Sequence, residues 1–257
     1  MKVPFPIRAV PALTFRAWLT PPPIGEKTRA RDRDTLAGLQ SFRVGEIACI
    51  ELGSGPLVLA LHGWGGRPAQ MVAPALALAG VGYRVVIPEL PGHAGGGPTD
   101  IKQAAAAVRK LVSELGMPDI VIAHSFASMV MRLAFEEEAP PTIALFAPAL
   151  DVNDALSRFG DKLGLFSWSR RGLRRRLEAW DPAMWPKVSG ILPEQFPDTE
   201  LYVIHDPADD EAPFGRSAEL AALRPGTMLK VVTDVGHTRI LDDPEVLDWF
   251  ARLAATR

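Results

Sequence analysis

Short apolar runs alternate with longer helix-compatible stretches from about residue 41 onward, and this pattern restricts the fold more than any other feature. The run at residues 57–62 is apolar on both faces, which is typical of a central parallel strand buried beneath helices. Similar runs lie at residues 44–52, 84–88, 119–124, 142–147, 200–205 and 227–233. Strands that alternate with helices are joined by crossover connections. The pattern therefore predicts an α/β fold with a mostly parallel sheet of about eight strands flanked by helices.

Helices are predicted in the intervals between these runs. The intervals with helix-compatible composition are residues 68–79, 100–116, 126–138, 214–223 and 242–255. The first two strands, around residues 41–52, are connected tightly near Gly45, which indicates an antiparallel hairpin.

Residues 151–199 interrupt the alternation, because they contain no convincing strand. They carry three of the six tryptophans, and Leu173, Leu177 and Trp180 fall on one helical face. We therefore predict a small helical cap inserted between two core strands. The cap also holds a cluster of five arginines: Arg170, Arg171, Arg174, Arg175 and Arg176. We interpret the cluster as a solvated helix face, with attraction of an anionic substrate or surface as the alternative.

The first 40 residues differ from the rest in composition. The run Pro21-Pro22-Pro23 breaks regular structure, and the charged stretch at residues 25–34 after it is expected to be solvated. Residues 8–19 are apolar enough to pack as an arm on the domain or on a partner. The predicted division is an N-terminal arm at residues 1–40, a core at residues 41–150 and 200–257, and the cap insertion at residues 151–199.

Charge, cysteine content and apolar run length weigh against several classes of protein. The formal net charge is −2, so the chain as a whole is not attracted to nucleic acid or to an anionic membrane. Cys49 is the single cysteine, so no internal disulfide can form; it lies in an apolar run that favours a small buried residue over a reactive thiol. We find no signal-peptide core and no apolar run of the about 18 residues that a membrane span needs. A soluble, cytoplasmic protein without stable membrane insertion is expected.

A strand-to-turn-to-helix pattern at residues 119–130 (DIVIAHSFASMV) predicts a nucleophile. The strand leads into Ala123-His124-Ser125-Phe126-Ala127, where small residues two positions before and after the serine let strand and helix approach. Ser125 would lie at the amino end of the helix, whose free N–H groups favour developing negative charge. A helix-capping serine is the alternative interpretation. Ser128, which would lie within the helix, is the nearest competitor as nucleophile.

The strand at residues 57–62 runs into His62-Gly63-Trp64-Gly65-Gly66, whose glycines would let the backbone approach a reacting carbonyl. The backbone N–H groups of Trp64 and Phe126 are the predicted oxyanion-hole donors. A flexible strand-to-helix turn is the alternative, and His62 is expected to make structural hydrogen bonds.

Residues 201–213 (LYVIHDPADDEAP) read as a strand followed by a turn with three aspartates, Asp206, Asp209 and Asp210. A carboxylate in this turn could hold the tautomer of a histidine in the last loop, while the other aspartates serve as turn residues or helix caps. Asp151, after the preceding strand, is a more distant alternative.

The predicted base is His237, which follows Gly236 in the loop after the last strand. Of the five histidines, it alone lies C-terminal to the acidic turn. The resulting chain order of serine, aspartate and histidine is the one expected of an α/β sheet with a nucleophile elbow.

Together these segments resemble the α/β-hydrolase superfamily, which contains serine esterases and lipases. The resemblance covers nearly the whole chain from about residue 41 and rests on LVLALHGWGG, RVVIPELPGH, VIAHSFAS, LYVIHDPADDEAP and VGH. Members commonly carry His-Gly-x-x-Asp-x-x-x-Pro at the acidic turn. Aligned on His205 and Pro213, that pattern implies that Asp209 is the catalytic acid.

Three features depart from the family pattern. Alanines replace both elbow glycines, Asp206 replaces the glycine after His205, and Pro88-Glu89 stands where many relatives have an aspartate.

The resemblance implies hydrolysis of a small carboxylic ester of short to medium acyl chain through an acyl-enzyme, with no metal or organic cofactor. Ser125 would be the nucleophile, His237 the base and Asp209 the supporting acid. The substrate pocket is expected to include Trp64, Phe126, Trp168 and Trp180. The alternatives are a lactonase, amidase or acyltransferase that uses the same triad, or a non-catalytic binding protein on the same fold; the oligomeric state is left open.

Overall fold

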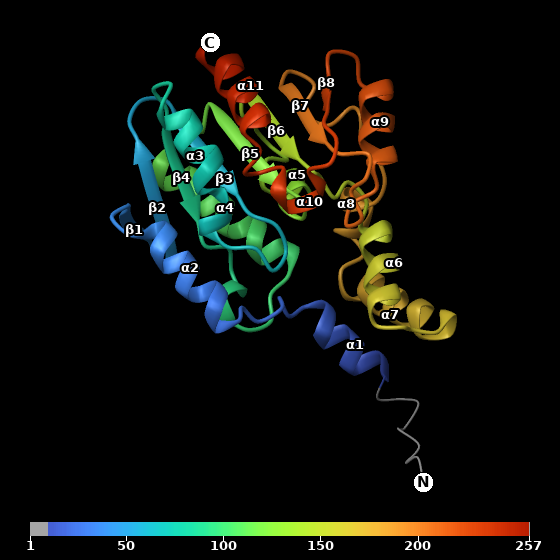
Figure 1. Cartoon of the computed structure of the whole chain (residues 1–257). Coiled ribbons are helices and arrows are strands. Elements are labelled where there is room, and N and C mark those ends of the chain that lie inside the picture. Colours follow the sequence, from blue (N-terminus) through green and yellow to red (C-terminus); the bar gives the residue numbers. More distant parts are fainter. Residues whose placement is uncertain (1–9, 257) are drawn as a thin grey trace.

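The computed structural model describes residues 10–256, and in that range it contains one sheet of eight strands (Figure 1). The strands are β1 (Gln40–Val44), β2 (Ile47–Gly53), β3 (Leu57–Leu61), β4 (Arg84–Pro88), β5 (Ile120–His124), β6 (Thr142–Phe146), β7 (Glu200–His205) and β8 (Met228–Val231). Their order is β1-β2-β4-β3-β5-β6-β7-β8; β1–β2 and β2–β4 pair antiparallel and the other neighbours pair parallel. The predicted mostly parallel α/β fold is therefore confirmed, and Gly45, with φ of 59°, makes the turn of the expected hairpin.

Helices precede the first strand, lie between later strands and follow the last strand. They are α1 (Val10–Trp18), α2 (Glu26–Leu36), α3 (Val72–Ala79), α4 (Ile101–Leu115), α5 (Ala127–Ala134), α6 (Val152–Lys162), α7 (Ser167–Trp180), α8 (Trp185–Val188), α9 (Phe214–Leu223), α10 (Gly236–Arg239) and α11 (Pro244–Ala255). Short 3₁₀ turns add Pro68–Met71 and His93–Gly95.

Relative to the sequence-based expectation, the structure adds a helix in the charged stretch and shortens the helix after β5. The charged stretch at residues 25–34 lies largely in α2, which buries no residue, as expected of a solvated segment. The helix predicted at residues 126–138 ends at Ala134. Three glutamates follow at residues 136–138, and negative charge opposes the dipole at the carboxyl end of a helix.

The burial of each strand follows its place in the sheet. Every residue of the central strands β3, β5 and β6 is buried, as expected when helices cover both faces. The edge strand β8 has no buried residue, and β1 at the other edge has one, Val44.

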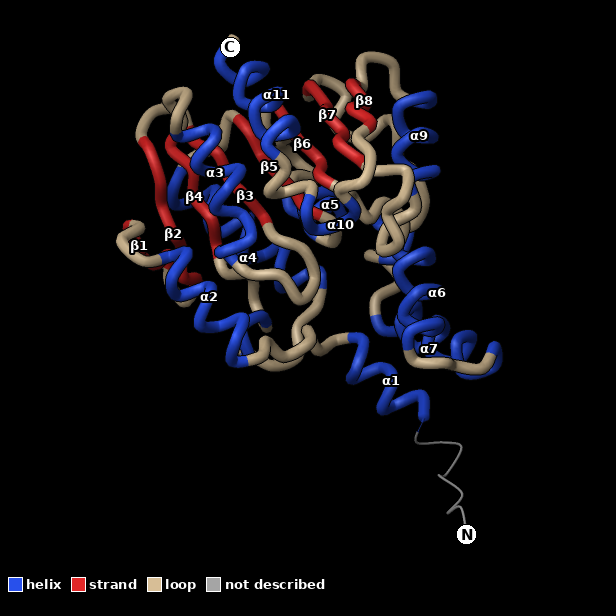
Figure 2. Tube along the Cα trace, viewed as in Figure 1, coloured by secondary structure: helices blue, strands red, loops and turns tan. Residues whose placement is uncertain are grey.

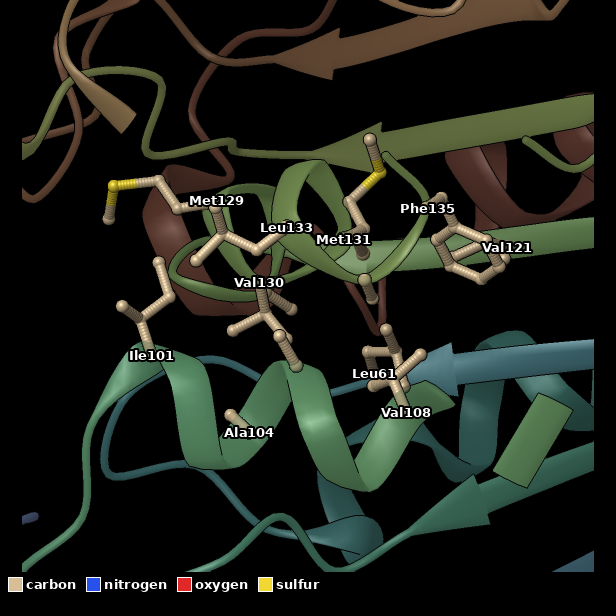
Figure 3. Packing of buried hydrophobic residues seen from close by; sticks show 14 of the residues in the cluster. Leu61, Ile101, Ala104, Val108, Val121, Met129, Val130, Met131, Leu133 and Phe135 are labelled. Atoms are coloured by element: carbon tan, nitrogen blue, oxygen red, sulfur yellow. The ribbon is translucent and has the colours of Figure 1, made fainter. Parts of the chain in front are cut away.

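Helices cover the sheet in two layers, with α3 and α11 on one face and α4 and α5 on the other (Figure 2). In the second layer, Ile101, Ala104 and Val108 on α4 point toward α5, and Val130 on α5 points back toward them (Figure 3). Burial of one such large apolar side chain contributes about 2 kcal/mol to stability. This packing fixes α5, and with it the turn between β5 and α5.

The loops that carry the predicted catalytic groups leave the same edge of the sheet. In parallel strands the carboxyl ends share one edge, and Ser125, Asp209 and His237 follow β5, β7 and β8. Residues 151–199 hold α6, α7 and α8 and no strand. Helices α6 and α7 project beyond the sheet on this side, and α1 lies beside them (Figure 1).

A half-buried carboxyl group, that of Glu89, lies just after β4. Oε1 of Glu89 has no hydrogen-bond partner within residues 10–256, although it lies 3.7 Å from Nε2 of His62. The pair is not a salt bridge, because burial lowers the pKa of His62 to about 3 and its Nε2 already accepts a hydrogen bond from the N–H of Leu90. Burial, with the negative charge of Asp32 nearby, raises the pKa of Glu89 to about 7, while Arg67 acts in the opposite direction.

Replacement Glu89→Gln should therefore change stability in a pH-dependent way. The folded protein retains a proton that the unfolded chain releases near its ordinary pKa of 4.5, so Glu89 lowers stability as pH rises from there to about 7. At about pH 8 the variant should be more stable by about 1–2 kcal/mol, or about 3–6 °C in unfolding midpoint; at about pH 5 the difference should nearly vanish. Thermal unfolding followed by circular dichroism at both pH values measures this effect. Glu46→Gln, at an exposed carboxylate, is the matched control. A Glu89→Gln variant that is less stable than the wild type at the higher pH would contradict the interpretation.

Candidate active site

Ser125 lies at a strained turn between β5 and α5. Its φ is 53°, in the left-handed region that costs a non-glycine residue about 1–2 kcal/mol. Ala123 and Ala127 are fully buried, so their methyl groups allow the strand and the helix to approach although glycines are absent. The backbone of Ser125 is held by β6 and its loop, because its N–H donates to the Phe146 carbonyl at 3.1 Å and its carbonyl accepts from the Ala149 N–H at 3.1 Å.

The structure brings together the three side chains predicted as the triad. Nδ1 of His237 lies 2.7 Å from Oδ2 of Asp209, and Nε2 lies 2.9 Å from Oγ of Ser125. A carboxylate can only accept, so Nδ1–H donates to Asp209 and Nε2 is left to accept the serine hydroxyl. His237 lies in the short helix α10 rather than in an open loop, and 14% of its side chain is exposed.

The side chain of Asp209 is completely buried and surrounded by hydrogen-bond donors. Its Oδ2 also accepts from Nε2–H of His205 at 3.0 Å, and its Oδ1 accepts from the N–H groups of Glu211 and Ala212 at 2.7 and 2.9 Å. Burial alone would favour the neutral acid, but the hydrogen bonds from His205, His237 and Ala212 outweigh it and hold the pKa of Asp209 well below its usual range. The carboxylate is therefore ionised and can stabilise a positively charged His237.

The structure distinguishes between the aspartates that the sequence left as alternatives. Asp206 accepts from the N–H groups of Val235 and Gly236 at 2.9 and 2.7 Å, so it anchors the segment that leads to His237. Asp210 is exposed. Asp151 caps α6 through the N–H of Asn153 and pairs with Arg216 at 3.0 Å.

Two further histidines are buried close to the site. His62 makes the structural hydrogen bonds expected of it, donating from Nδ1 to the Gly63 carbonyl at 3.0 Å and accepting from the Leu90 N–H at 3.1 Å. Nε2 of His124 lies 3.0 Å from the carbonyl oxygen of His237 and donates to it. Burial, aided by the neighbouring His237, lowers the pKa of His124 to about 3, so it is a neutral anchor. Sequence reasoning assigned no role to His124, because it packs against a residue 113 positions away.

The predicted oxyanion donors lie on either side of the serine. A Cβ added to Gly63 would lie 3.0 Å from Cβ of Ser125, so the turn after β3 approaches the serine as closely as a glycine allows. The Trp64 and Phe126 rings contact each other edge to face at 5.2 Å. Within residues 10–256, neither the Trp64 N–H nor the Phe126 N–H donates a hydrogen bond, so both are free to bind an oxyanion.

A cavity of about 450 Å³ opens beside Ser125. Trp64, Phe126 and Trp180 line it as expected, together with Trp185 of the cap. Trp168 does not line it, and the prediction for this residue is corrected: Leu173 and Leu177 turn the other face of α7 inward, which leaves Trp168 44% exposed.

The N-terminal arm supplies a wall of the cavity that sequence reasoning missed. Trp18 and Leu19 line it, and the Trp18 ring meets Phe159 of α6 edge to face at 5.2 Å. Phe15 contacts Trp180 in the same way at 5.7 Å. Packing of the arm on the domain, one of the two expected possibilities, thus holds for its described part; residues 8 and 9 lie outside the described residues.

After α1, the arm runs along the domain to the turn after β3. The Leu19 carbonyl accepts from the N–H of Thr99 at 2.7 Å. A Cβ on Gly65 would lie 2.6 Å from Cγ of Pro22, so the proline run is packed directly against the turn that carries Trp64. The arm therefore joins the cap to the predicted oxyanion loop.

Two other kinds of reactive site, a metal centre and a nucleophilic thiol, find no support in the described residues. Within residues 10–256, no group of three or more His, Cys, Asp or Glu side chains could hold a metal ion. Cys49 is buried, and burial raises the pKa of its thiol to about 11, so it is not a nucleophile at neutral pH.

Comparison with solved structures reveals the same fold in other proteins. An α/β hydrolase enzyme from a sediment metagenome of the Mar Chica lagoon, Morocco, has a TM-score of 0.61 at 19% identity, covering 83% of this chain and 96% of that one. An esterase from Exiguobacterium antarcticum has a TM-score of 0.59 at 16% identity, covering 82% and 96%. At these identities the similarity establishes the fold.

Comparison of sequences adds one curated relative and a family. The magnesium-chelatase 30 kDa subunit of Rhodobacter capsulatus is 32% identical over 129 residues, which are 46% of this chain and 42% of that protein. The chain thus spans less than half the length of this relative. A family model described as "Alpha/beta hydrolase family" matches residues 57–255. Together with the sheet order and the turn at Ser125, this match establishes that the chain belongs to the α/β hydrolase family.

Proposed function

We propose that this protein hydrolyses carboxylic esters of short to medium acyl chain through an acyl-enzyme formed on Ser125. The observation that carries the proposal is the hydrogen-bonded series from the Ser125 hydroxyl through His237 to Asp209, next to an apolar cavity. The similarity in fold to an esterase agrees with hydrolase chemistry.

Acylation begins with proton transfer. Nε2 of His237 takes the proton of Ser125 as Oγ attacks the ester carbonyl, and Asp209 stabilises the imidazolium that forms. The carbonyl oxygen becomes negatively charged and binds to the N–H groups of Trp64 and Phe126, each worth on the order of 100- to 1,000-fold in rate. Nε2–H of His237 then protonates the leaving alcohol, and the acyl group remains on Ser125.

Deacylation repeats these steps with water as the nucleophile. Water enters the position left by the alcohol, His237 takes its proton, and its oxygen attacks the acyl carbonyl. Collapse of the second tetrahedral intermediate returns the proton to Ser125 Oγ and releases the carboxylic acid.

The cavity supports the proposed substrate class. Its size lies in the ordinary range for small-molecule sites, and side chains of the cap and the arm, such as Phe159, Trp185 and Trp18, make its wall largely apolar. We treat α6, α7 and α8 as a cap that covers the acyl chain.

A panel of p-nitrophenyl esters of increasing acyl length, lactones and amides tests the reaction class. We expect highest kcat/KM for esters of short to medium chain. Lactone or amide turnover far above that of all esters would overturn the assignment while leaving the triad in place.

Ser125→Ala should lower kcat by about 10⁴-fold or more, because the attacking hydroxyl is lost. It should also abolish labelling by a fluorophosphonate probe, while circular dichroism and the unfolding midpoint stay close to those of the wild type. Ser128→Ala, three residues away inside α5, is the matched control and should still be labelled. Labelling that persists in Ser125→Ala would contradict the proposal.

Asp209→Asn should lower kcat by about 10³- to 10⁴-fold, because an amide can donate to Nδ1 and favour the wrong tautomer of His237. Asp206→Asn should lower it less, by about tenfold, since it only loosens the segment before His237. Asp210→Asn should have no effect. Steady-state kinetics on one ester rank the three variants by kcat. If Asp209→Asn kept full activity while Asp206→Asn lost it, the assignment of Asp209 as the catalytic acid would be wrong.

Trp18→Ala should shift the acyl-chain preference, because Trp18 forms part of the cavity wall and its removal enlarges the cavity. The ratio of kcat/KM for an octanoate ester to that for a butanoate ester should rise by about tenfold or more. Leu13→Ala alters the same helix at a side chain that is 56% exposed, and should leave the ratio unchanged. If Trp18→Ala left this ratio of kcat/KM values unchanged, the N-terminal arm would not contribute to the substrate site.

A further inference from the structure

The end of the cap carries apolar side chains that the substrate cavity does not use. Leu163, Phe166 and Trp168 lie within six residues of one another, at the turn between α6 and α7, and are 49%, 72% and 44% exposed. Exposed large apolar side chains are ordinary when isolated, but a cluster of them marks a contact surface. We call these residues, together with Arg171 and Arg175, the cap tip.

The two arginines of the cap tip share a helix face with the tryptophan. Trp168, Arg171 and Arg175 are spaced i, i+3 and i+7 along α7, which places them on one side of the helix. The opposite side carries Leu173 and Leu177, which are 0% and 2% exposed. Packing of these leucines therefore fixes an outward stripe that is both aromatic and cationic.

The charge of this stripe is not neutralised by neighbouring carboxylates. Arg170 and Arg174 pair with Asp161 and Glu178. Arg171 and Arg175 are exposed and form no ion pair within residues 10–256. Asp161 and Glu178 are thus already paired with other arginines, and the guanidinium groups of Arg171 and Arg175 remain unpaired on the same helix face as Trp168.

The cap tip projects away from the sheet, at the far end of α6 and α7 (Figure 2). Three apolar side chains on a projecting turn are too few for an ordinary protein interface, which buries about 800 Å² on each partner. Such a turn can enter the headgroup layer of a bilayer, where aromatic rings are favoured and each nearby arginine gains from anionic lipid. In the part of the chain that the structure describes, no helix is long and apolar enough to cross a bilayer, so the contact is peripheral.

We propose that the cap tip docks on the surface of bilayers that contain anionic phospholipid, with Phe166 and Trp168 in the headgroup layer and Arg171 and Arg175 against phosphate groups. The cavity lining reaches Lys162, one residue before the cap tip begins, so docking brings the substrate cavity close to the lipid surface. The interaction concerns this surface alone and does not depend on the reaction catalysed at Ser125.

Sedimentation of the full-length protein with vesicles tests the proposal. Binding is expected to vesicles of equimolar phosphatidylcholine and phosphatidylglycerol, to weaken with added salt, and to be much weaker with phosphatidylcholine alone. Arg171→Ala/Arg175→Ala and Phe166→Ala/Trp168→Ala should each weaken binding by about tenfold or more. The control Arg31→Ala/Arg33→Ala removes two exposed arginines of α2 and should bind as the wild type does.

Tryptophan fluorescence gives a second readout that does not require a loss of binding. The emission of the wild type should shift to shorter wavelength on the mixed vesicles, and Trp168→Phe should remove most of that shift while it still binds. Unfolding midpoints check that each variant is folded. Absence of binding to the mixed vesicles would overturn the proposal, as an acidic protein partner would then be the better explanation of the stripe. Binding that the α2 control weakens as much as the cap-tip variants do would overturn it as well.

Discussion

The buried carboxylate of Asp209 is the group on which the geometry of the site depends. Its 2.7 Å hydrogen bond keeps a proton on Nδ1 of His237, and only then can Nε2 accept the hydroxyl of Ser125. A buried ionised group is stable only when donors surround it. Asp209 has two imidazole donors and two backbone N–H donors, from residues that all lie at the carboxyl edge of the sheet.

Hydrogen bonds between loops hold the candidate catalytic groups in register. Asp206 binds the backbone just before His237, and His124, next to Ser125, donates to the carbonyl of His237. The segments after β5, β7 and β8 are therefore tied to one another as well as to the sheet. This support allows Ser125 to remain at a positive φ, a strained conformation that persists where the surrounding packing determines it.

Helix α7 has two faces with different surroundings. On α7, Leu173 and Leu177 pack inward, while Trp168 and its neighbouring arginines face solvent. The arm also lines the cavity and places Trp18 against Phe159 of α6. The cavity wall thus combines segments from the beginning and the middle of the chain, and its shape depends on how these segments dock rather than on any one of them.

Local patterns were sufficient to predict the strands, five helices of the core and the places of Ser125 and His237, because hydrophobic periodicity and turn chemistry act over a few residues. They could not separate Asp209 from Asp206 without a family resemblance, since both lie in one turn and differ only in what each meets across the fold. Tertiary structure decided that Trp168 faces solvent and that Trp18 forms part of the cavity wall. Helix rotation and long-range docking depend on contacts between segments far apart in the chain, which periodicity does not encode.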